Sequence, residues 1–184
     1  MNKYWENQLN KSVVYQQLKS NCERNNQHEV LALVEKISTF AIERLKTVIK
    51  NMPEFTLHDD THIYNMLTII GKLIPQEKLR KLSTPDLFML IISVLLHDIG
   101  MAPDEKYILA WKNQLSEAEY DETLIEERRK FARFRLTYTH QVEDIERLRE
   151  EQEFSKAQLI EDYIITEYIR MTHSIRAREI IAKY

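Results

Sequence analysis

The chain of 184 residues contains very little glycine and proline: two glycines, Gly71 and Gly100, and four prolines. Hairpin turns and β-bulges depend on these residue types, because glycine adopts the positive φ angles of tight turns and proline fixes their bend. Their scarcity excludes a fold of many short strands joined by tight turns. It predicts long helices and an all-α fold class.

The chain also lacks disulfides, a large excess of one charge and a signal peptide. Cys22 is the only cysteine, so no internal disulfide can form, and a reducing compartment fits. The net charge of −3, from 26 basic and 29 acidic residues, gives no general attraction to nucleic acid or to an anionic membrane. The N-terminus has no apolar signal core, and no apolar run approaches membrane-spanning length. We therefore expect a cytoplasmic protein without a membrane partner, and nucleic acid is disfavoured as a partner.

Helical periodicity is present where turn signals are absent. The polar run at 21–27 separates a short helix over roughly 5–20 from the remainder, and residues 28–184 are expected to form one helical domain behind an N-terminal helix and linker at 1–27. The expected helices of that domain cover about 28–50, 60–73, 84–98, 116–135, 139–151 and 155–182. The chain ends in the last helix without a stop signal, which predicts a truncated domain with a further C-terminal segment.

The most apolar of these helices, at about 84–98, is expected to lie at the centre of the fold. Thr84 is a suitable N-cap for it, and from Leu87 to Leu96 only Ser93 is not apolar. A helix that is apolar all round is buried on every side. Gly100 suits its C-terminal cap. The sequence therefore predicts a helical bundle around a central buried helix.

Three of the six histidines lie in two short windows, FTLHDDTHIYNML and SVLLHDIGM. In the first window, His62 falls within the first turn of an expected helix. Its side chain is expected to share a core-facing stripe with residues that follow at helical spacing, namely Met66, Ile69 and Leu73. We therefore expect His62 to point inward at a helix end.

His97 and Asp98, in the second window, end the central helix, where both side chains can turn toward one ion. With His62 they supply two imidazoles and one carboxylate, a suitable ligand set for Zn²⁺, Fe²⁺ or Mn²⁺ that leaves positions open for water and substrate. Two other interpretations stay open. The histidines can be satisfied core residues, and the carboxylate of Asp98 can simply orient an imidazole.

The sequence HDDTHIYNML followed by LLHDIGM resembles the HD superfamily of metal-dependent phosphohydrolases. More narrowly, FTLHDDTHIYNML, STPDLFMLIISVLLHDIGM and EYIRMTHSIRAREII resemble the bacterial HD-CE group, and this resemblance covers roughly residues 28–184. Members of that group are often fused to, or encoded beside, a GHKL-type ATPase. The resemblance implies an HD-domain bundle, a divalent metal (Mn, Fe, Zn, Ni or Mg) and a phosphorylated small molecule or nucleotide as substrate.

The resemblance also implies roles for the residues of the two windows. His62, His97 and Asp98 correspond to metal ligands, and Asp98 would take part in catalysis by bridging two ions if a second ion binds. His58 resembles in placement the histidine that protonates the leaving oxygen in cyclic-nucleotide phosphodiesterases. An imidazole near its ordinary pKa suits such general-acid work. The alternative to this catalytic role is that His58 is simply a loop histidine or a residue at the entry to the helix.

Four further residues are candidates for binding the substrate. His173 resembles a downstream family histidine that serves a second metal or the substrate phosphate. Arg170 and Arg176 could hold phosphate by bidentate contacts, with a solvent-facing position on a helix as the alternative for each. Asn65 lies one turn from His62 and could face the pocket.

One departure from the family pattern bears on activity. HD enzymes usually complete the metal shell with an Asp on a later helix, but this chain has no Asp after His173, and Asp144 and Asp162 precede the expected place. A metal-dependent phosphohydrolase is the function that the resemblance implies. An incomplete site would instead make the domain a nucleotide-sensing or scaffold module for an ATPase partner. A third alternative is an HD-type nuclease, which the net charge of −3 disfavours.

Overall fold

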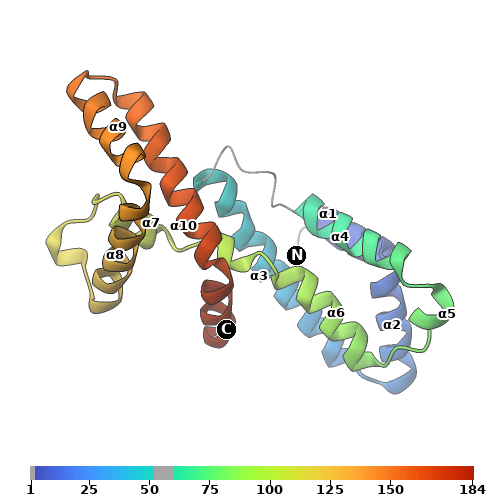
Figure 1. Ribbon diagram of the computed structural model, residues 1–184. Coiled ribbons are helices and arrows are strands. Elements are labelled where there is room, and N and C mark those ends of the chain that lie inside the picture. Colours follow the sequence, from blue (N-terminus) through green and yellow to red (C-terminus); the bar gives the residue numbers. More distant parts are fainter. Residues whose placement is uncertain (1–2, 52–59) are drawn as a thin grey trace. The chain divides into compact units, whose positions relative to one another are not determined.

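The computed structural model describes residues 3–51 and 60–184, and all regular structure in these ranges is helical, without a strand (Figure 1). The all-α fold class is therefore confirmed. The chain divides into two compact units, Met1–Ala102 with Lys183–Tyr184, and Pro103–Ala182. Each unit is described by itself below.

The first unit begins with two helices where the sequence predicts one. The expected helix over about 5–20 is interrupted at Ser12, which is extended (φ −67°, ψ 123°), and α2 continues to Asn25, within the expected linker. Asn26 ends α2 in the left-handed conformation (φ 54°), which asparagine tolerates better than most residues. The helices of this unit are α1 (Lys3–Lys11), α2 (Val13–Asn25), α3 (His28–Asn51), α4 (Asp60–Leu73), α5 (Gln76–Leu79) and α6 (Thr84–Leu96), followed by the short 3₁₀ helix η1 (Ile99–Met101).

Both N-terminal helices contribute to the core of the first unit. Trp5, Leu9 and Leu18 are almost completely buried, and α2 packs against α3, α4 and α6. The division of the chain at residue 27 into an N-terminal segment and a domain stays a prediction.

Helix α6 is central to the first unit, because it packs against α2, α3 and α4. Leu87, Ile91 and Leu95 are fully buried along one face. The expectation of burial on every side is wrong, since Met89 is 58% exposed and Ser93 is exposed. Apolar composition all round a helix thus overstated its burial.

The two ends of α6 differ from the expected caps. Ser83, not Thr84, is the N-cap: its hydroxyl accepts a hydrogen bond from the Asp86 amide (3.3 Å), and its own amide donates to the Asp86 carboxylate (2.9 Å). This reciprocal capping box satisfies two amides that would otherwise lack partners. At the other end, His97 is the C-cap and Gly100 lies in η1 without a positive φ, so Gly100 does not cap the helix.

Helix α4 buries a different face from the expected one. Ile63 and Leu67 are fully buried, whereas Ile69 and Leu73 are exposed. The predicted core stripe through Met66, Ile69 and Leu73 is therefore wrong, because apolar residues occur on more than one face of α4 and the sequence does not show which face packs. The helix also approaches α2 closely at Gly71, where an added Cβ would lie 2.5 Å from Cγ2 of Val13.

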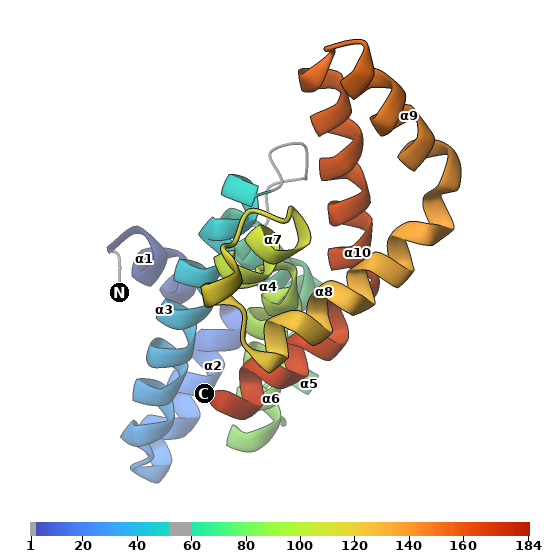
Figure 2. The ribbon, with the colours of Figure 1, turned by 90° about the vertical axis from the view of Figure 1, so that its left-hand side faces the viewer.

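The second unit contains α7 (Glu105–Trp111), α8 (Glu122–Arg135), α9 (Thr139–Glu150) and α10 (Phe154–Lys183), with 3₁₀ turns at Glu117–Glu119 (η2) and Leu136–Tyr138 (η3). Its core is aromatic: the Tyr168 ring meets the rings of Trp111 and Phe131 at centroid distances of 5.2 and 5.3 Å. Helices α9 and α10 run side by side in opposite directions (Figures 1 and 2), joined by an ion pair of 3.0 Å between Arg149 and Glu161.

The apolar segment Thr84–Trp111 is long and apolar enough to cross a membrane by length and composition alone. The expectation that no apolar run approaches such a length is therefore wrong. A buried core helix of a soluble protein meets the same criteria of length and composition, and 44% of the most apolar 18-residue stretch in this segment is buried. Helix α6 itself has 13 residues, which span about 20 Å, and the segment leaves α-helical geometry after Leu96.

The one-sided burial of α6 predicts effects of very different size for two substitutions on it. Ile91→Ala should lower the free energy of unfolding by about 2–5 kcal/mol, because it removes a fully buried side chain and leaves a cavity. Met89→Ala, at the exposed position on the same helix, should change it by less than about 0.5 kcal/mol. Chemical denaturation followed by circular dichroism measures both, and equal losses in the two variants would contradict this packing.

Candidate metal centre

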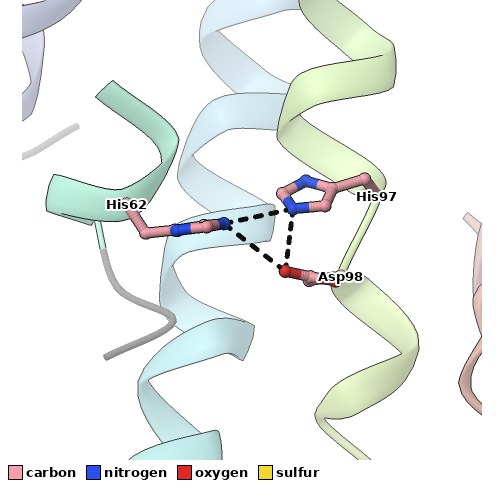
Figure 3. Close-up of side chains that lie close together, drawn as sticks. All are labelled: His62, His97 and Asp98. Carbon is pink, nitrogen blue, oxygen red and sulfur yellow. Dashed lines mark hydrogen bonds and ion pairs between the residues drawn. The ribbon is translucent and has the colours of Figure 1, made fainter. Parts of the chain in front are cut away.

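Two packed helices of the first unit bring His62, His97 and Asp98 together (Figure 3). His62 lies in the first turn of α4, and His97 and Asp98 follow the last residue of α6. The backbone leaves α-helical geometry between the two neighbours, since His97 has φ −57° and ψ −38° whereas Asp98 has φ −105° and ψ 9°. Adjacent side chains on a regular helix diverge by about 100°, and this change of geometry accompanies their turning toward one point.

The three ligand-type atoms form a compact triangle. Nε2 of His62 lies 3.2 Å from Nε2 of His97 and 3.6 Å from Oδ2 of Asp98, and the His97 and Asp98 atoms are 2.7 Å apart. Ligand atoms at about 2.1 Å from a tetrahedral ion lie about 3.4 Å from one another. Two sides of the triangle agree with that spacing, and the third is the length of a direct hydrogen bond. The donor set therefore fits a divalent metal ion.

A backbone contact orients His97. Its Nδ1 lies 2.8 Å from the carbonyl oxygen of Val94, and because a carbonyl only accepts, Nδ1–H is the donor. The other ring nitrogen, Nε2, is thereby directed at Asp98 and His62. Such an outer hydrogen bond fixes the ring and tautomer that a metal-binding histidine needs. Val94 could not be predicted from the sequence, since a backbone carbonyl leaves no signal in the residue type.

The charge of Asp98 acts on His97 directly. Its hydrogen bond raises the pKa of His97, the Val94 carbonyl adds to this effect, and partial burial opposes it. A proton and a metal ion would compete for Nε2 of His97. The side chains of His62, His97 and Asp98 are 34%, 29% and 17% exposed, so all three are partly accessible to solvent.

Of the two other candidates in the first sequence window, only Asn65 lies within the described residues. Asn65 is exposed on α4, and its role in substrate binding stays a prediction. His58 lies outside the described residues, and its role as general acid stays a prediction as well.

The remaining candidates belong to the second unit. Nδ1 of His173 donates to the backbone carbonyl of Arg170 (2.6 Å), and exposed Arg170 pairs with Glu167 at 3.1 Å. Arg176 is buried, only 7% exposed, so the alternative of a solvent-facing position does not apply to it. The roles of these three residues in substrate binding stay predictions.

No fourth ligand joins the triangle among the described residues. Among the side chains that the structure describes, in residues 5–48 and 61–184, His62, His97 and Asp98 form the one group of at least three His, Cys, Asp or Glu side chains close enough to hold an ion. The two aspartates that precede the expected place are engaged within the second unit. Asp144 pairs with Arg147 at 2.6 Å, and Asp162 pairs with Lys112 at 2.8 Å.

The comparison with protein families supports an HD-type domain. The family model HD-CE matches residues 52–184, well over half of the chain, and the match includes His62, His97 and Asp98. Neither the comparison with curated proteins nor that with solved structures finds a match.

The triangle predicts that metal binding depends on its members. After incubation with Mn²⁺, Fe²⁺ or Zn²⁺ and removal of free ions, the wild type should retain near-stoichiometric metal, measured by elemental mass spectrometry. His97→Ala and Asp98→Ala should each weaken binding by at least about tenfold, because losses even outside the ligand set reach that size.

His140→Ala is the matched control for this experiment. Its side chain is 95% exposed on α9, where it lies 3.6 Å from Glu143, so the variant should retain metal as the wild type does. Circular dichroism confirms that each variant is folded. A folded His97→Ala variant with full metal content would contradict the assignment.

Proposed function

Because this chain belongs to the HD-CE family and contains an HD-type domain, we propose that it is a metal-dependent phosphohydrolase that cleaves a phosphate ester. One observation carries the proposal: two imidazole nitrogens and one carboxylate oxygen, from two separate helices, lie within 4.8 Å of one another. A core histidine needs no such partners. A phosphorylated small molecule or nucleotide is the proposed substrate class.

The residues of the triangle would have distinct tasks. His62, His97 and Asp98 would hold the divalent ion, with Val94 fixing the ring of His97. When bound at such a site, a divalent ion lowers the pKa of its water and stabilises the charge that develops on phosphate oxygens. The three side chains are partly exposed, which gives water access to them. His58 is the proposed proton donor to the leaving oxygen.

A second candidate function rests on the ligand count. With three ligands in the described part of the chain, and with Asp144 and Asp162 in ion pairs of their own, the ion would be held less tightly than by a complete set. A domain of this kind could bind a nucleotide without hydrolysing it and report its presence to a GHKL-type ATPase partner. This alternative needs a nucleotide to bind at the triangle of His62, His97 and Asp98, but it needs no hydrolysis.

A substrate screen tests both functions. With Mn²⁺, Fe²⁺, Ni²⁺ or Mg²⁺ supplied, we expect hydrolysis within a panel of phosphomonoesters, cyclic nucleotides, nucleoside triphosphates and single-stranded nucleic acid. His97→Ala and Asp98→Asn should lower the rate by more than about tenfold, since a ligand contributes at least as much as a group that only supports one. His140→Ala, exposed and remote from α4 and α6 in sequence, should leave the rate unchanged.

The outcomes separate the candidates. Turnover that persists at full rate in folded His97→Ala would exclude the triangle as its site. No turnover on the whole panel, together with saturable nucleotide binding that His97→Ala weakens, would favour the sensing module.

A further inference from the structure

The second unit has a pocket of its own, with a volume of about 130 Å³, between α7, α8 and α10. Its walls carry equal numbers of basic and acidic side chains, and α8 and α10 each supply one of either sign. Those four residues are Glu127, Lys130, Arg176 and Glu179. Tyr107 of α7 and Tyr168 and Thr172 of α10 add hydroxyl groups to the same walls.

Arg176 is held rigidly in this wall. Its guanidinium carbon lies 5.5 Å from the centroid of the Trp111 ring, an arrangement in which the ring face attracts the cation. Nη2 donates to Oγ1 of Thr172 at 2.8 Å. Burial lowers the pKa of Arg176, while the nearby carboxylate of Glu127 opposes that effect, and a guanidinium remains charged in either case. The pocket therefore contains a fixed, largely desolvated positive charge.

Glu127 is the fixed negative charge on the facing helix. Its side chain is 20% exposed, and it accepts hydrogen bonds from Lys130 Nζ (3.0 Å) and from the Tyr168 hydroxyl (3.4 Å). Burial and the charge of Glu127 raise the pKa of Tyr168, so the hydroxyl keeps its proton and remains a donor. Glu179 lies on the exposed side of α10 and adds a second carboxylate.

The balance of charge restricts what the pocket can accept. Two basic and two acidic side chains line the pocket, so its walls give no net attraction to a ligand that carries charge of one sign only. A phosphate dianion would meet both Glu127 and Glu179. A ligand that is neutral overall but carries one group of each sign uses both kinds of wall.

We propose that this pocket binds a small zwitterion, a molecule with one carboxylate and one ammonium group, such as a small free amino acid. The carboxylate would lie against Arg176 and the ammonium group against Glu127 and Glu179. The volume of about 130 Å³ is well below the roughly 300–1,000 Å³ of pockets for drug-sized ligands, which suits a molecule of few heavy atoms. This proposal goes beyond the hydrolase function and does not rest on it. It assigns Arg176 a carboxylate in place of the phosphate expected from the sequence.

Titration calorimetry on the full chain tests the ligand chemistry. Glycine, alanine and serine, titrated to about 10 mM, cover dissociation constants in the millimolar range and below. We expect at least one to bind saturably. Its methyl ester, which lacks the carboxylate, and its N-acetyl derivative, which lacks the ammonium group, should each bind at least about tenfold more weakly, because each loses a charged hydrogen bond.

Matched variants test the location. Glu179→Gln keeps the shape of the wall and should weaken amino-acid binding by at least about tenfold. Glu126→Gln is the control: this residue lies on α8 next to Glu127, is half exposed, and faces Arg129 at 3.9 Å. It should bind as the wild type does. The proposal is overturned if none of the three amino acids binds, if the derivatives or inorganic phosphate bind as tightly, or if the folded Glu179→Gln variant binds unchanged.

Discussion

The buried face of α6 is the constraint on which the first unit depends. This helix packs against α2, α3 and α4 and buries Leu87, Ile91 and Leu95. This packing positions α6, and His97 and Asp98 lie directly after its last residue. Helix α4 packs on the same helix and buries Ile63 and Leu67, and Nε2 of His62 lies 3.2 Å from Nε2 of His97. The relative positions of the three side chains therefore depend on the packing of α4 against α6.

Several parts of this arrangement could be read from the sequence because their signals are local. The bounds of α3 and α4 follow from apolar periodicity and helix-start residues, and the proximity of His97 and Asp98 follows from adjacency. The packed face of α4 could not be predicted, because it depends on which helices pack against α4. Ile63 and Leu67 are buried there, whereas Ile69 and Leu73 are exposed. Helix α7, at 7 residues, is too short to show a period. The contact between His97 and Val94 depends on a rotamer.

The second unit is organised by a different kind of packing. Its core contains the rings of Trp111, Phe131 and Tyr168 together with the guanidinium of Arg176. A charged residue is thus buried at a position that the apolar pattern of the sequence would predict to be exposed. An arginine can do this because its flat, weakly hydrated head stacks on an aromatic face. Apolar periodicity therefore describes α10 poorly: Leu159, Met171 and Ile175 are exposed while Arg176 is buried.

The hydrogen bond between His97 and Val94 has a consequence for the choice of ion. The last four carbonyls of a helix lack partners within it, and together with the aligned peptide dipoles they give the C-terminal end about half a negative elementary charge. His97 satisfies one of these carbonyls and presents its other nitrogen just beyond that end. The backbone of α6 thus contributes an electrostatic potential that attracts cations, in addition to the carboxylate of Asp98. Part of the selectivity for a positive ion would survive any change of side chain.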